Sequence, residues 1–214
     1  MDPRAVRGAT SAALAAIGQT GHSITDFVRD VPFARTNLDP LTYELSDLRT
    51  LLERLQDGVV IPPPLQASTL SLVGGCGLVL ARIDSVLADC GDGPLRSGRW
   101  VTKAKDEIRG LKVGLQSSRR ALRLALEVAN LSAANEFMAD PNAIGIGATD
   151  IKQDASELLI RIHQLRARIP GPERDYRGFN FGLLKSLDGM VSFVESVWGD
   201  AITGRLERSP VDHE

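Results

Sequence analysis

The fold of this chain is decided by residues 39–58, DPLTYELSDLRTLLERLQDG. Leucine recurs there at positions 41, 45, 48, 51 or 52, and 55, which is the spacing of one buried stripe on an α-helix. Asp39 and Pro40 read as a cap followed by proline at the first helical position, and Gly58 reads as the stop. Partner helices must cover such a stripe.

The same helical periodicity recurs in every long segment on either side of this stretch. No segment shows sustained alternation of apolar residues with polar β-branched ones, the pattern of a half-buried strand. The other expected helices cover about residues 3–29, 65–87, 98–133, 151–169 and 181–198. The sequence therefore predicts an all-α multi-helix bundle, with a four-helix core and one or two C-terminal helices.

Turn signals separate these helices. Three prolines at 62–64 precede the third helix, and the segment Gly91-Asp92-Gly93-Pro94 ends it. Residues 141–147 read as a connection, after which Thr149 or Asp150 is the expected cap of the fifth helix. We expect three parts along the chain: a helical bundle over 1–170, an amphipathic helix packing on it over 171–203, and a polar tail over 204–214.

Composition limits the class of protein. The 214 residues are 43% apolar, which is typical of a globular chain and excludes disorder throughout. The 25 basic and 27 acidic residues nearly balance, so a general nucleic-acid binder is disfavoured. The two cysteines, Cys76 and Cys90, predict plain thiols in a reducing intracellular compartment rather than a disulfide scaffold.

The motifs of common enzymes are missing from the sequence. It holds no Gly-x-x-x-x-Gly-Lys-Ser/Thr phosphate loop, no His-Glu-x-x-His, no Glu-x-x-His pair and no Gly-x-Ser-x-Gly elbow. His22, His163 and His213 are too far apart along the chain to suggest a metal cluster. We therefore expect no catalytic residue, no cofactor and no metal site.

The first thirty residues form an unusual helix. Residues 8–25 carry no charge and are mostly small, with an apolar stripe that includes Val6, Ala9, Ala13 and Ile17. One interpretation is a core helix that stays covered by its partners. The other is conditional insertion into a bilayer: the uncharged stretch reaches only the lower end of the roughly 17 to 25 residues needed to span, but small residues favour close helix contacts in lipid.

A second candidate site is a basic run in the fourth helix. Such residues can meet anionic lipid head groups, each contributing on the order of 1 kcal/mol near the surface. The alternative is a solvated helix face. The run consists of Arg96, Arg99, Lys103, Lys105, Arg109, Lys112, Arg119, Arg120 and Arg123.

Four segments, taken in order, resemble the fungal HeLo-like domain. They are 43–55 (YELSDLRTLLERL), 80–87 (LARIDSVL), 105–115 (KDEIRGLKVGL) and 120–126 (RALRLAL), behind a Met-Asp-Pro start and a small-residue first helix. The resemblance spans about residues 1–132. It is carried by the ordered set, since each segment alone is an ordinary leucine-rich amphipathic helix.

The resemblance implies a dormant bundle that permeabilises membranes and executes cell death, as in HET-S-related toxins and, by analogy, the necroptosis executioner. Oligomerisation would free the first helix to insert, moving the protein from cytoplasm to plasma membrane. By carry-over, Asp2 matches an acidic residue near the family's N-terminus. The inserted positions would be Val6, Leu14 and Ile17, with Ala9 and Ala13 on the same helix.

The resemblance also implies partners: anionic membrane phospholipids, further copies of the chain, and an upstream amyloid-templating receptor reached through a segment outside this chain. Residues 179–182, FNFG, match the pattern of a necroptotic amyloid core; alternatively, Asn180 caps the last helix. That last helix is a possible latch over the bundle, through Leu184, Leu187, Val191, Val194 and Trp198. The alternative function is a non-lytic signalling or adaptor domain of a fungal immune receptor.

Overall fold

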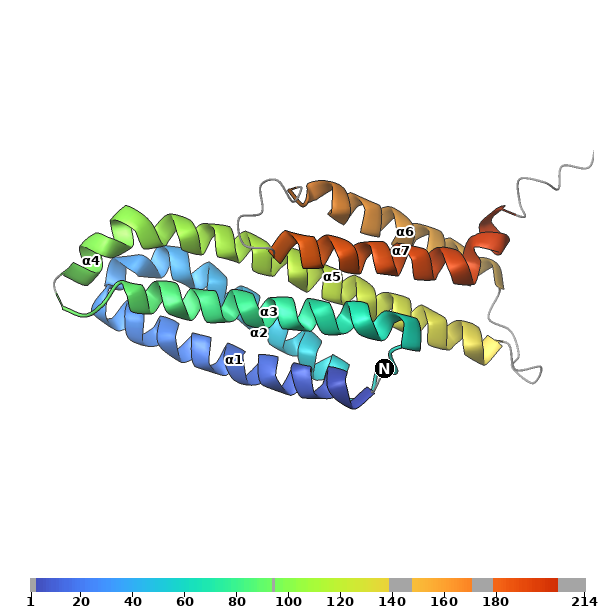
Figure 1. Ribbon diagram of the computed structural model, residues 1–214, viewed down its shortest axis with the longest axis horizontal. Helices are drawn as coiled ribbons and strands as arrows, with labels where there is room; N and C mark the ends of the chain where they lie inside the picture. Colours follow the sequence, from blue (N-terminus) through green and yellow to red (C-terminus); the bar gives the residue numbers. More distant parts are fainter. Residues whose placement is uncertain (1–2, 94, 139–147, 171–178, 204–214) are drawn as a thin grey trace, which may run out of the picture.

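The structure is a computed structural model that describes residues 3–93, 95–138, 148–170 and 179–203 (Figure 1). These residues are almost entirely helical and contain no strand, so the all-α prediction is confirmed. The long helices are α1 (Pro3–Asp30), α2 (Arg35–Gln56), α3 (Pro63–Asp89), α5 (Lys105–Met138), α6 (Ala148–Arg168) and α7 (Phe179–Thr203). The expected connection at 141–147 and the tail at 204–214 lie outside the described residues.

Two four-helix groups share α3 and α5, which run side by side through the middle of the elongated molecule (Figure 1). In the first group, α1 packs on α2 and α3, and α2 packs on α5. In the second, α6 and α7 pack on each other, α6 on α5, and α7 on both α3 and α5. The last helix is therefore part of a second bundle that uses the same central pair.

The junction between α1 and α2 differs from the prediction. A short 3-10 turn, η1 (Pro32–Ala34), leads directly into α2, which begins at Arg35 with Pro40 inside it. Proline in the second turn removes one backbone hydrogen bond, but the earlier start places Leu38 in the core with no exposed surface. The predicted start at Asp39–Pro40 was wrong because tertiary burial outweighed the capping signal.

The glycines after α3 act as predicted, but the helix begins at Pro63, two residues before the predicted start at Leu65. Pro62 precedes the helix and the two prolines after it fill its first positions, where their missing N–H groups cost nothing. Gly91 and Gly93 have φ values of 66° and 75°, a left-handed conformation that favours glycine. The chain then turns back into α4 (Leu95–Arg99), three residues before the predicted start at Gly98.

A π-helical turn joins α4 to α5, and the sequence pattern did not predict it. This turn, η2 (Trp100–Ala104), adds a residue to the helical repeat and buries Trp100, whose ring centroid lies 5.2 Å from that of Phe27 in α1. Two predicted caps were also wrong: Thr149 and Asp150 fall within the first turn of α6, and Phe179 already belongs to α7, so Asn180 lies inside that helix.

Replacing Trp100 with alanine should lower the free energy of unfolding by about 3–5 kcal/mol, because the change leaves a large cavity against Phe27. Val101→Ala, in the same turn but 60% exposed, should change it by less than about 0.5 kcal/mol. Urea unfolding followed by circular dichroism measures both. Equal effects of the two variants would contradict the packing role of Trp100.

Candidate functional site

Helix α1 turns its predicted stripe toward the bundle. Val6, Ala13 and Ile17 are buried, while Ala9 and Leu14 are partly buried against the core. The stripe prediction is therefore confirmed for Val6, Ala9, Ala13 and Ile17. Asp2 lies outside the described part of the chain. The inserting role assigned to them stays a prediction, because in this structure they are packing residues.

The N-terminal two-thirds of α1 packs through small and polar groups beside the apolar Val6 and Ile17. Thr10 and Thr20 are fully buried in its interface, together with Ala13. Thr20 Oγ1 donates a hydrogen bond of 2.9 Å to Asp84 Oδ2 on α3, and Gln56 Nε2 on α2 donates one of 3.2 Å to Ser11 Oγ. Small side chains bury little apolar area, so this part of the interface gains less hydrophobic stabilisation per turn than a leucine stripe does.

The C-terminal end of α1 is anchored by larger groups. Phe27 is fully buried against Trp100, and the Arg96 guanidinium lies 4.5 Å from the centroid of the Phe27 ring. Arg96 also forms an ion pair with Asp30, at the last residue of α1. Cation–π and aromatic contacts of this kind add to the burial of the rings. The aromatic and cation–π contacts of α1 thus lie at its C-terminal end.

The predicted basic run does not form one lipid-facing surface. Arg96 has a side chain only 15% exposed and is used inside the protein, as described above. Arg119 faces α2, with Nε 3.0 Å from Glu44 Oε2 and Nη1 2.7 Å from Asp47 Oδ2. Carboxylates of α1 and α2 thus pair with both residues in this structure, and the head-group contacts assigned to them stay a prediction.

The other seven basic residues are divided among several faces of the rod formed by α4, η2 and α5. Arg99 and Lys103 line a pocket of about 260 Å³ beside Cys90, together with the carboxylates of Asp89 and Glu107. Arg109 pairs with Asp106 one turn away on the exposed surface, at 2.9 Å, while Lys105 and Lys112 are half-buried. The remaining two, Arg120 and Arg123, face α6.

Sequence reasoning missed the residues that Arg120 and Arg123 meet. Arg161 and Arg168 of α6 line the same pocket, so four arginines from two helices gather there. The sequence did hold a signal: Arg120 and Arg123 are three residues apart, and Arg161 and Arg168 are seven apart. Each of these spacings places the two arginines on one face of their helix. Which helices would meet could not be read from that spacing.

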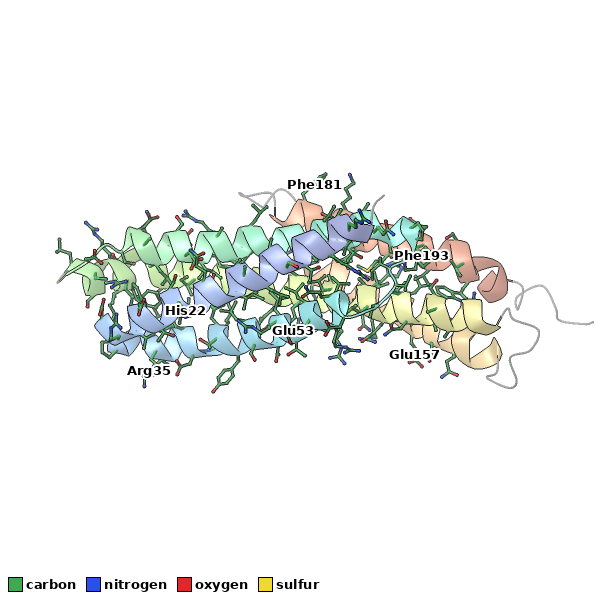
Figure 2. The ribbon with its side chains drawn as sticks, turned by 90° about the horizontal axis from the view of Figure 1, so that it is seen from below. His22, Arg35, Glu53, Glu157, Phe181 and Phe193 are labelled. Atoms are coloured by element: carbon green, nitrogen blue, oxygen red, sulfur yellow. The ribbon has the colours of Figure 1, made fainter. Side chains whose placement is uncertain are left out.

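The proposed latch helix packs closely on the bundle. Leu187, Val194 and Trp198 of α7 are buried, and Leu184 and Val191 are partly buried. At Gly189 the helices approach closely: a Cβ atom there would lie 2.5 Å from Ser68 Oγ of α3. All five predicted latch residues therefore contribute to packing. Phe181 projects from α7 to the outside and is 62% exposed (Figure 2).

One described helix is long and apolar enough to cross a membrane, and it is α3 rather than α1. Length and composition alone give this result, and a core helix of a bundle passes the same test. In the fold α3 is such a core helix, since it contacts α1, α5 and α7. Among the described residues no three His, Cys, Asp or Glu side chains form a group able to hold a metal.

Comparison of the chain with models of protein families, with curated proteins and with solved structures finds no match.

The buried thiols should react slowly in the folded protein. Burial raises the pKa of Cys76 to about 12, against the smaller opposing effect of a hydrogen bond with Ser118, and burial likewise raises the pKa of Cys90. The reactive thiolate is therefore scarce at pH 8. We expect Cys90→Ser protein to label with a disulfide reagent at least about tenfold more slowly when folded than in urea. Equal rates would show that Cys76 is accessible.

Proposed function

We propose that this protein is a membrane-permeabilising effector of cell death whose α1 leaves the bundle after oligomerisation, as its resemblance to HeLo-like domains implies. The single observation that supports it best is the uneven attachment of α1. Its N-terminal two-thirds packs through Thr10, Ala13 and Thr20 beside the apolar Val6 and Ile17, while the aromatic Phe27 anchors its C-terminal end. We expect a helix attached in this way to separate first at its N-terminal end, while Phe27 keeps its C-terminal end in the bundle.

The position of α1 in the bundle also supports release. Among the long helices α1 packs chiefly on α2 and α3, so the contacts that join α3, α5, α6 and α7 do not depend on it. The uncharged segment Gly8–Thr25 then offers its small and apolar residues to lipid, where close packing between copies is favoured. Release therefore leaves a four-helix group intact.

The second candidate function is a non-lytic adaptor in which α1 never leaves. The hydrogen bond from Thr20 to Asp84 favours it, because breaking a part-buried polar contact costs free energy. Dye release from anionic-lipid vesicles separates the two functions. Leakage by the full chain that disappears on deletion of residues 1–21 supports the effector; no leakage from either protein, even when fused to an oligomerisation module, supports the adaptor.

Thr20→Val should promote release. The change keeps the shape of the side chain but leaves Asp84 without its hydroxyl donor, which costs about 1–3 kcal/mol. We expect the protein concentration for half-maximal leakage to fall by about fivefold or more. The matched control is Thr25→Val, since the Thr25 hydroxyl is exposed and bonds only to Gly21 O within α1. Equal leakage by both variants would argue against release of α1.

Gly189→Leu tests the latch. The larger side chain cannot fit against Ser68, so it should push α7 away from α3 and raise spontaneous vesicle binding by the full chain. Gly110→Leu is the control, because it adds an equally apolar side chain where no atom lies within 4 Å of the new Cβ. Co-sedimentation with anionic vesicles measures both. If Gly189→Leu binds no more than the control, α7 is a structural helix and not a latch.

A further inference from the structure

A groove between α5 and α6 gathers positive charge. It has a volume of about 210 Å³ and is lined by Arg120, Arg123, Leu124, Arg161, Gln164, Leu165 and Arg168. Its leucines are buried, at 4% exposure for Leu124 and 6% for Leu165, so they close the floor of the groove. The arginines stand around this floor. We call this feature the arginine groove.

One carboxylate serves two of the four arginines. Glu127 Oε2 lies 2.5 Å from Arg161 Nη1, Glu127 Oε1 accepts a bond of 3.2 Å from Arg161 Nη2, and the same oxygen lies 3.1 Å from Arg123 Nε. The ion pairs orient both guanidinium groups at one end of the groove. Each guanidinium has five N–H donors, so both retain donors for another oxyanion.

The other two arginines have no carboxylate partner among the described residues. Arg120 and Arg168 are exposed and line the groove; Arg120 lies seven residues before Glu127 on α5, and Arg168 lies seven residues after Arg161 on α6. Four guanidinium charges against one carboxylate leave an excess of three positive charges, which repel one another. A ligand with several negative charges would relieve this repulsion and occupy the free donors.

The surroundings favour a compact ligand over a long one. Beyond Arg161 the same helix pair forms a second pocket lined by Glu127, Asp154 and Glu157, and Glu157 lies at the surface of α6 (Figure 2). These carboxylates bound the positive groove at that end. An extended polyanion such as a nucleic acid would have to run over them, whereas a small ring that bears several phosphates would not.

We infer that the arginine groove binds a compact polyphosphate, with guanidinium groups of α5 and α6 donating to phosphates on one small molecule. Arginine suits this role because its planar fork matches two phosphate oxygens at once. The same chemistry occurs free in solution, as in an inositol trisphosphate, and on a lipid head group, as in a phosphatidylinositol bisphosphate. Binding of a soluble polyphosphate does not depend on the proposed membrane function, whereas binding of a lipid head group rests on it.

Titration calorimetry of the full chain with inositol 1,4,5-trisphosphate tests the inference. We expect saturable binding with one site, and a loss of affinity of about tenfold or more in Arg120→Gln/Arg168→Gln, because charge-assisted hydrogen bonds are removed. The control is Arg109→Gln, an exposed arginine of α5 that pairs with Asp106 outside the groove. It should bind as the unchanged protein does, and circular dichroism should give the same helicity for all three.

Vesicles distinguish the two sources. The lipid head group is the ligand if the protein binds phosphatidylinositol 4,5-bisphosphate vesicles more tightly than phosphatidylserine vesicles of equal charge, and if the double variant loses this preference. If the protein binds inositol trisphosphate but shows no such preference between vesicles, the ligand is a soluble polyphosphate. Absence of saturable trisphosphate binding, equal affinity in the double variant, or tighter binding of a 20-nucleotide RNA would overturn the inference. Dye release is a separate measurement, so failure of membrane permeabilisation leaves the trisphosphate result standing.

Discussion

The antiparallel packing of α3 against α5 is the constraint on which the rest of the structure depends. Arg82 of α3 binds Glu107 of α5 through Nε at 2.9 Å and Nη2 at 2.7 Å, and further along Cys76 lies beside Ser118. The later residue of α5 thus lies beside the earlier residue of α3, which shows that the two helices run in opposite directions. This pair supplies two faces, and each face carries its own pair of helices: α1 with α2, and α6 with α7. Loss of the central pair would leave neither group with a core.

The two outer pairs are attached by different physical means. On one side, α2 presents leucines that are fully or almost fully buried, and Arg119 of α5 binds its Glu44 and Asp47. On the other, α7 combines the buried Met190 and Val194 with a close approach at Gly189. Helix α1 differs from both, because Thr10, Ala13 and Thr20 interrupt its buried apolar face. The proposed release of α1 follows from that contrast within a single bundle.

The partner of each charged side chain in this protein depends on which helices pack together, and not on which charged residues are neighbours in the sequence. The nine basic residues predicted as one run lie on different faces of α4, η2 and α5. Their side chains therefore lie beside different helices, namely α1, α2, α3 and α6. Arg96 and Arg119 are thereby taken into internal ion pairs, while Arg120 and Arg123 join Arg161 and Arg168. A nearly neutral chain can in this way carry a locally cationic groove, because opposite charges elsewhere are already paired.

The sequence by itself determined the helices and their buried faces, since leucine spacing, prolines and glycines act locally. The stripes of α1 and α2 and the glycine turn at Gly91 and Gly93 were predictable for that reason. Only the tertiary structure decided the start of α2 ahead of Pro40, the π-turn that buries Trp100, and the meeting of four arginines across α5 and α6. These features depend on which helix lies opposite which, and a periodic pattern within one helix carries no information about its partner.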